Sequence, residues 1–309
     1  MLRKLGISRP SKSIEDTKSE ISLIPADELT SKSAGTQTPA SVSGVSTPSL
    51  PRARSEKLSE EELAIMHAEC MKQLRIKVDE LMLVEMANAN NEEDATLAMK
   101  REKKYLEMRD QDLNRFLVAR NHNVDNALEL LKISEKWRIK NTPVDTSACL
   151  NEIRCGLAWI SGHDKQGRAL VYVDVTVLDK NTRDLEKTTN FAVWMISQAV
   201  ESSMANNQEQ ICLLFDLANF GLKTMDYQLV KNLLFLLSNA FPERTAYLFI
   251  MNAPTLFKGF WSVIKPWIDE GTARKIQFLS VQQLVEREFA DMDQLPEQLG
   301  GPRKFEPAM

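Results

Sequence analysis

Apolar residues recur at a helical spacing in the N-terminal half of the chain. Ser59 is followed three residues later by Glu62, the pattern of a capping box that starts a helix. The helix that follows is expected to carry an apolar stripe at every fourth position, made of Met66, Cys70, Leu74, Val78 and Met82. Three further helical patterns follow. One starts near Thr96, the next contains Leu113, and the last comes after Asp125, which we expect to cap it. The pattern therefore predicts an all-helical N-terminal lobe.

The pattern changes after about Leu157, where short apolar segments begin to alternate with longer amphipathic ones. The predicted strands are residues 157–160, 169–175, 211–217, 246–251 and 276–279. The predicted helices between and after them are residues 187–205, 226–240, 255–265 and 281–289. Two of the strands, 211–217 and 246–251, are apolar on both faces, which is typical of parallel strands covered on both sides. We therefore expect an α/β fold in which helices flank a mostly parallel sheet.

Composition excludes several classes of protein. The 309 residues are 43% hydrophobic and 27% charged, with a formal net charge of −4, so no overall basic field favours nucleic acid. The four cysteines form no CxxC pair and the three histidines share no metal-type spacing, so we expect no disulfide scaffold, no metal and a reducing compartment. No apolar run approaches the roughly 18 residues of a membrane span. These observations predict a cytoplasmic protein.

Motifs for catalysis and for cofactor binding are missing from the sequence. It contains no GxSxG nucleophile elbow, no GxxxxGK[ST] loop and no GxGxxG that follows a strand. Asp216 ends a predicted strand, where ligands often bind in open α/β sheets, but no partner base or metal site accompanies it. We therefore expect neither an enzyme nor a bound cofactor.

Residues 255–267 form a predicted helix that is more apolar than one packing face requires. Lys258, Ser262 and Lys265 share one face of it, and most other positions are large and apolar. Gly259 weakens the helix by about 1 kcal/mol relative to alanine, which suits an element that moves. The segment is either an ordinary core helix or one that meets apolar material beyond its own core, such as a lipid.

Short motifs spread over roughly residues 110–305, about two thirds of the chain, carry a family resemblance. In chain order they are LNRFLVAR (113–120), VDNA (124–127), KWR (136–138), DKQGR (164–168), DLANFG (216–221), FPER (241–244), NAP (252–254), KPWID (265–269), KI (275–276) and LPEQLGG (295–301). Their order and spacing resemble the CRAL-TRIO lipid-binding family, which includes phosphatidylinositol transfer proteins. The resemblance implies a helical lobe packed on a sheet that floors a hydrophobic lipid pocket, with residues 255–267 as a gate helix.

The resemblance also implies a domain division and a head-group site. We expect a disordered tail rich in Ser, Thr and Pro (1–57), a helical lobe (58–148) and a CRAL-TRIO lipid-binding domain (149–309). Inositol-lipid-binding members hold the head group with polar residues, and the matching positions here are Arg120, Glu243, Thr272 and Lys275. The sequence departs from the family pattern in two places. Asn121 stands where a basic residue often follows the position of Arg120, and Ile211 and Leu213 stand where members that carry choline lipids have hydroxyl residues. The resemblance therefore favours phosphatidylinositol, and a sterol, haem or another hydrophobic ligand is the alternative.

Residues on the apolar strands and on the gate helix are expected to line the pocket. The candidates are Leu213, Phe215, Phe249 and Met251 on the strands, with Val171 and Val173, and Phe257, Phe260, Trp261 and Ile264 on the gate helix. Only alternate residues of a strand can face the ligand, and the sequence leaves open which half does. We expect a protein that binds one phospholipid and transfers it during transient contact with membranes. The alternative function is a ligand-sensing scaffold that regulates a protein partner without bulk transfer.

Overall fold

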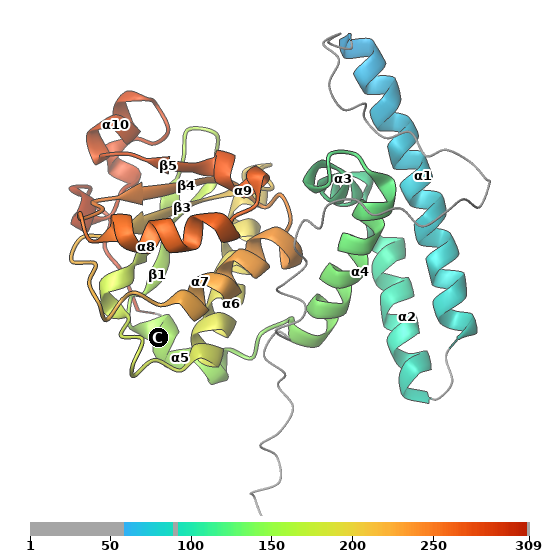
Figure 1. The fold of residues 1–309 in the computed structure, drawn as a ribbon, viewed down its shortest axis with the longest axis horizontal. Helices are drawn as coiled ribbons and strands as arrows, with labels where there is room; N and C mark the ends of the chain where they lie inside the picture. The colour runs from blue at the N-terminus through green and yellow to red at the C-terminus, as the bar shows by residue number, and fades with distance from the viewer. Residues whose placement is uncertain (1–58, 89–91, 308–309) are drawn as a thin grey trace, which may run out of the picture. The chain divides into compact units, whose positions relative to one another are not determined.

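The computed structural model describes residues 59–88 and 92–307 of the chain, and all of them belong to one compact unit. The expected tail, residues 1–57, lies outside the described residues. Four helices form the N-terminal lobe (Figure 1): α1 (Glu60–Ala87), α2 (Glu92–Glu107), α3 (Asp110–Ala119) and α4 (Val124–Asn141). The predicted stripe of α1 packs in the core of this lobe, where Cys70, Leu74 and Val78 are buried against α3 and α4.

The helix starts follow local capping chemistry. Ser59 and Glu62 form the predicted capping box, because the Ser59 hydroxyl accepts the Glu62 amide while the Glu62 carboxylate accepts the Ser59 amide. The prediction that Asp125 caps α4 is wrong. Asn123 is the cap, since its side-chain oxygen accepts the Asn126 amide, and Asp125 lies in the first turn, where a negative charge is also favourable. The second helix begins at Glu92, earlier than the expected Thr96.

A five-stranded sheet in the order β1-β2-β3-β4-β5 forms the second part of the structure. The strands are β1 (Ala158–His163), β2 (Ala169–Asp174), β3 (Ile211–Asp216), β4 (Thr245–Met251) and β5 (Ile276–Phe278). The first two strands form an antiparallel hairpin, and all the later pairs are parallel. The mostly parallel sheet predicted from the apolar strands and their helical crossovers is therefore confirmed.

Helices cover both faces of this sheet. Figure 1 shows α6 (Leu185–Met204), α7 (Tyr227–Phe235) and α8 (Phe257–Ile264) on one side, and α10 (Val281–Glu286) on the other. One turn of π-helix, Leu236–Ala240, continues α7. The shorter helices are α5 (Leu150–Arg154), α9 (Glu270–Lys275) and the 3₁₀ turns η2 (Thr146–Cys149), η3 (Val175–Val177), η5 (Lys265–Trp267), η6 (Met292–Gln294) and η7 (Glu297–Leu299).

Ion pairs and aromatic contacts join the helical lobe to the sheet part. The Arg244 guanidinium, which follows the π-helical turn, lies 3.5 Å from the Asp112 carboxylate of α3 and 3.0 Å from the Glu209 carboxylate. Arg115 donates a hydrogen bond to the carbonyl oxygen of Pro242 at 3.2 Å. The Trp137 ring of α4 packs edge-on against Phe235, the last residue of α7, and against Phe241, which follows the π-helical turn. The lobe is therefore held beside the segment that leads into β4.

Candidate functional site

Two rows of side chains cross the sheet and form the floor of an apolar cavity. The strand register aligns the first row as Val171, Leu213, Leu248 and Ile276, and the second as Ala158, Val173, Phe215 and Ile250. All eight residues line the cavity. Because side chains alternate across a strand, the shared register puts this set on the face that α6, α7 and α8 cover. The sheet therefore contributes a continuous hydrocarbon surface.

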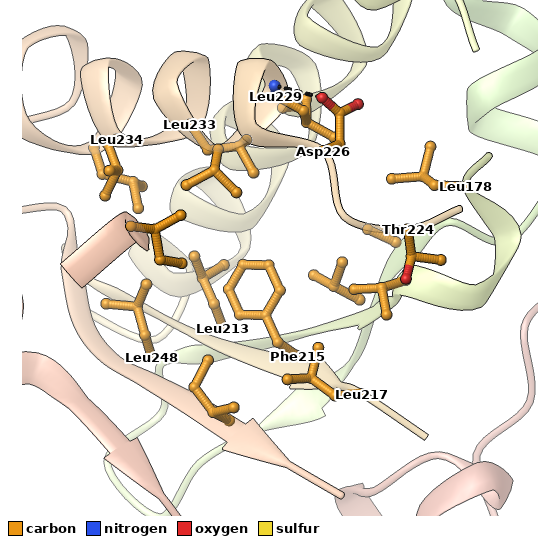
Figure 2. Close-up of a pocket in the computed structure, with 18 of the residues that line it drawn as sticks. Leu178, Leu213, Phe215, Leu217, Thr224, Asp226, Leu229, Leu233, Leu234 and Leu248 are labelled. Carbon is orange, nitrogen blue, oxygen red and sulfur yellow. Dashed lines mark hydrogen bonds between the residues drawn. The ribbon is translucent and has the colours of Figure 1, made fainter. Parts of the chain in front are cut away.

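Three helices form the walls and the roof of this cavity, which has a volume of about 210 Å³. Figure 2 shows Leu229, Leu233 and Leu234 of α7 on the side of the cavity opposite Leu213 and Leu248 of the floor. Residues of α6 line it as well, among them Phe191, Met195 and Ile196, and α8 contributes Phe257, Phe260, Trp261 and Ile264. The helices thus enclose the floor with aliphatic and aromatic side chains.

The few polar side chains at the cavity wall already have partners inside the protein. Asp226, labelled in Figure 2, forms an ion pair with Arg183 and accepts the Leu229 amide at 3.0 Å. The Thr224 hydroxyl is hydrogen-bonded to the backbone of Gly221 at 2.9 Å. Buried polar groups with partners gain little from a further ligand contact. The cavity wall therefore suits a hydrocarbon chain.

The structure sorts the predicted lining residues by the face of the sheet on which they lie. Leu213 and Phe215 line the cavity, as do Val171, Val173 and the four candidates on α8. The expectation that Phe249 and Met251 line it is wrong, because both belong to the core on the opposite face, beside α10. Their neighbours Leu248 and Ile250 line the cavity in their place, since adjacent residues of a strand point to opposite faces.

The four predicted head-group residues come from three segments: Arg120 follows α3, Glu243 precedes β4, and Thr272 and Lys275 belong to α9. They form two local groups. In the first, the Lys275 ammonium lies 2.7 Å from the Glu243 carboxylate, and both side chains are mostly buried. The Glu243 backbone has a left-handed φ of 57°, an uncommon conformation for a residue other than glycine. Charge pairing therefore holds this lysine and this glutamate in place.

The second group forms around Asp269, which the sequence analysis did not single out. Its carboxylate accepts the Thr272 amide at 2.9 Å, the Thr272 hydroxyl at 2.7 Å and the Ser238 hydroxyl at 2.8 Å. Burial alone would raise the pKa of Asp269, but the hydrogen bonds from Thr272 and Ser238 and the charge of Arg120 outweigh it and hold the pKa below its ordinary value. Burial lowers the pKa of the Arg120 guanidinium, and the charge of Asp269 partly opposes that effect.

We call these six residues the polar cluster: Arg120, Ser238, Glu243, Asp269, Thr272 and Lys275. The cluster adjoins the cavity, because three of its residues are next in sequence to residues that line it, namely Leu237, Ile268 and Ile276. Asp269 was present in the quoted motif KPWID, and its place as the residue before a short helix was a signal that could have identified it. Ser238 carries no such signal, because its position depends on the π-helical turn.

The part of the chain that the structure describes shows no feature for metal binding or for membrane spanning. No group of three or more His, Cys, Asp or Glu residues in it has a geometry that could hold a metal ion. None of the helices in these ranges combines the length and the apolar composition needed to cross a bilayer. The site is therefore described by the apolar cavity and the polar cluster.

Comparison with protein families agrees with this architecture. Residues 153–301 match the family model of the CRAL/TRIO domain. The segment 153–301 is thus similar in sequence to the CRAL/TRIO domain. The matched residues contain all five strands, the helices that line the cavity, and every residue of the polar cluster except Arg120. The family resemblance read from the short motifs is thereby confirmed.

Several curated proteins have sequences related to this chain. The phosphatidylinositol transfer protein CSR1 of Eremothecium gossypii is 29% identical in an alignment of 210 residues that covers 63% of this chain and 48% of CSR1. The CRAL-TRIO domain-containing protein C3H8.02 of Schizosaccharomyces pombe is 27% identical over 62% of this chain and 46% of its own length. The chain thus spans about half the length of these two relatives. The Sec14 cytosolic factor of the same yeast is 27% identical over 62% of this chain and 74% of its own length.

A solved structure shares the fold. The crystal structure of Sfh5 superimposes with a TM-score of 0.56, covering 81% of this chain and 91% of Sfh5, at 14% sequence identity. At this identity the similarity concerns the fold, an α/β domain with additional helices. The predicted fold class is confirmed.

Proposed function

We propose that the protein binds one phospholipid, above all phosphatidylinositol, and carries it between membranes without catalysing a reaction. The observation that carries the proposal is the apolar cavity with the polar cluster beside it, which matches a lipid with hydrocarbon chains and a charged head group. Burying one methylene stabilises by about 0.8 kcal/mol, so a 16-carbon chain gains about 12 kcal/mol over water. The name of CSR1, a phosphatidylinositol transfer protein, supports the same ligand class.

In this proposal α8 is the gate of the cavity. The cavity of about 210 Å³ is smaller than the 300–1,000 Å³ of ordinary small-molecule pockets, so a two-chain lipid needs α8 to move outward. Phe257, Phe260 and Ile264 of α8 are buried and line the cavity. Outward movement of α8 would therefore open the cavity along its length.

The outer surface of α8 and of the residues that flank it also fits contact with a bilayer. Leu256, Val263 and Trp267 expose 47%, 46% and 38% of their surface, and Lys258 and Lys265 are exposed beside them. Apolar and aromatic side chains bordered by lysines suit the boundary between lipid tails and head groups. We propose that the protein is cytoplasmic and meets membranes transiently through this surface.

The chemistry of the cavity favours a lipid over haem, the alternative ligand. Haem iron is held by His, Cys, Tyr or Met side chains. Among the described residues that line the cavity, none is His, Cys or Tyr. Of the four haem-ligand types, the lining contains Met alone, at Met195. A long hydrocarbon chain needs no such ligand and fits the lining as it stands.

Transfer of labelled phosphatidylinositol between vesicles tests the proposal. Lys275→Ala removes a charge-assisted contact to the head group, typically worth about 1.5–3 kcal/mol, so transfer should fall at least tenfold. Arg274→Ala is the matched control, because Arg274 is the adjacent residue of α9 and its exposed side chain lies 3.9 Å from Glu270. Transfer should be unchanged in the control. Wild-type protein that neither extracts nor moves phosphatidylinositol would contradict the proposal.

A further inference from the structure

The polar cluster contains as many carboxylates as cations. Lys275 pairs with Glu243 at 2.7 Å, and Arg120 interacts electrostatically with Asp269. The four formal charges therefore sum to zero. The exposed neighbours Arg274 and Glu270 cancel as well, at a separation of 3.9 Å. A head group with several negative charges would find no excess positive charge among these residues.

Asp269 is a firmly held negative charge at this place. Its two oxygens accept three hydrogen bonds at 2.7–2.9 Å, two from Thr272 and one from Ser238, which come from different segments of the chain. It is also the helix cap of α9. Together these bonds hold the carboxylate in place and keep it ionised.

We propose that Asp269 determines the charge of the head group that the polar cluster accepts. This inference rests on the proposed function. Phosphatidylinositol carries one negative charge on its phosphodiester, and a phosphate added to the inositol ring brings about 1.5–2 further negative charges. Asp269 repels that added charge. The site therefore selects phosphatidylinositol over its phosphorylated forms.

Lipid extraction from mixed vesicles tests this assignment. The vesicles contain equal amounts of labelled phosphatidylinositol and phosphatidylinositol 4-phosphate, and the ratio of the two lipids bound to the protein is measured. Asp269→Asn removes the charge but keeps an oxygen that can accept the Thr272 amide, because asparagine caps helices as well as aspartate does. The wild type should extract mainly phosphatidylinositol. The variant should raise the share of the 4-phosphate by about tenfold, since a like charge at close range has been removed.

The control variant is Asp184→Asn, which makes the same change at the cap of α6. The Asp184 carboxylate accepts the Lys187 amide at 3.1 Å, as Asp269 accepts the amide three residues on, and it forms no described contact with the polar cluster. Its lipid ratio should equal that of the wild type. Asp269→Ser, a second neutral cap, should give the same lipid ratio as Asp269→Asn. If one of the two variants folds poorly, the other still tests the inference.

The outcomes separate the inference from the proposed function. A wild type that binds phosphatidylinositol, together with an unchanged ratio in both Asp269 variants, would overturn the inference and leave the proposed function intact. Equal extraction of the two lipids by the wild type would also overturn the inference. A wild type that extracts neither lipid would contradict the proposed function, and with it the inference.

Discussion

Neighbouring residues of one strand have different surroundings in this protein, and this decides which of them can meet a ligand. On β3, Leu213 lines the cavity, whereas Leu214 is fully buried in the core on the other face. Both are leucines in a run that is apolar at every position. The two faces therefore differ in packing rather than in composition.

This difference predicts opposite effects for the same substitution at adjacent positions. Leu213→Phe adds carbons to open space, so the free energy of unfolding should change by less than about 1 kcal/mol while lipid binding falls several-fold. Leu214→Phe adds the same carbons to a filled core, where overpacking costs about 1–3 kcal/mol. Urea unfolding and vesicle extraction measure the two effects. Equal stability losses in both variants would show that the cavity cannot accept extra atoms.

The sequence predicted the type of lining residue but only part of the lining itself. Alternation limits the candidates to half of each strand, and nothing in a run such as residues 211–215 distinguishes the two halves. Phe249 and Met251 were assigned to the wrong face for this reason. In the polar cluster, Ser238 and Asp269 meet across 31 residues of sequence, a contact that depends on the assembled sheet and on a π-helical turn.

Whole elements were easier to predict, because their signals are periodic or local. The stripe of α1 and the capping box at Ser59 come from spacing within a few residues, and both are found in the structure. Helix ends were less certain, as the cap at Asn123 shows, since several residue types can cap a helix. The excess apolar surface of α8 is explained by its two faces, one over the cavity and one exposed.

Gly259 in α8 offers a test of how this helix moves. A Cβ atom added there would have nothing within 4 Å, so Gly259→Ala is sterically free. It should stabilise the helix by about 1 kcal/mol. If α8 opens by bending or local unfolding, lipid exchange between vesicles should slow about fivefold, while the amount of lipid bound at equilibrium stays similar. A higher melting temperature with an unchanged rate of lipid exchange would indicate that α8 moves as a rigid body.

At the scale of the whole molecule, one carboxylate connects the helical lobe to the rest of the chain. Asp112 on α3 lies within 3.5 Å of the guanidinium groups of Arg109, Arg115 and Arg244. Arg244 precedes β4, so the contact spans the lobe and the sheet part. Burial opposes ionisation of Asp112, but the hydrogen bonds and charges of Arg109 and Arg115 outweigh it and hold its pKa below the ordinary value.

Asp112→Asn should therefore weaken the union of the two parts. Removing the charge takes one carboxylate partner away from the mostly buried Arg115 and Arg244, which we expect to cost about 2 kcal/mol of the free energy of unfolding. Urea unfolding followed by circular dichroism and by tryptophan fluorescence should give coincident transitions for the wild type. The transitions should separate in the variant, because Trp137 is in the lobe while the other four tryptophans are in the sheet part. Asp110→Asn is the control, since Asp110 contacts Arg75 within the lobe and is 73% exposed.

The effect of Asp112 should also depend on pH in a defined direction. A carboxylate whose folded-state pKa is depressed stabilises the protein above its unfolded value, about 3.9, and loses that contribution as pH falls through the folded-state pKa. The difference in stability between wild type and Asp112→Asn should be complete at pH 6 and should shrink as the pH is lowered below about 4. Other acids titrate equally in both proteins, so the difference isolates Asp112. A gap that stays constant to pH 3 would mean that shape, rather than charge, makes Asp112 hold the lobe in place.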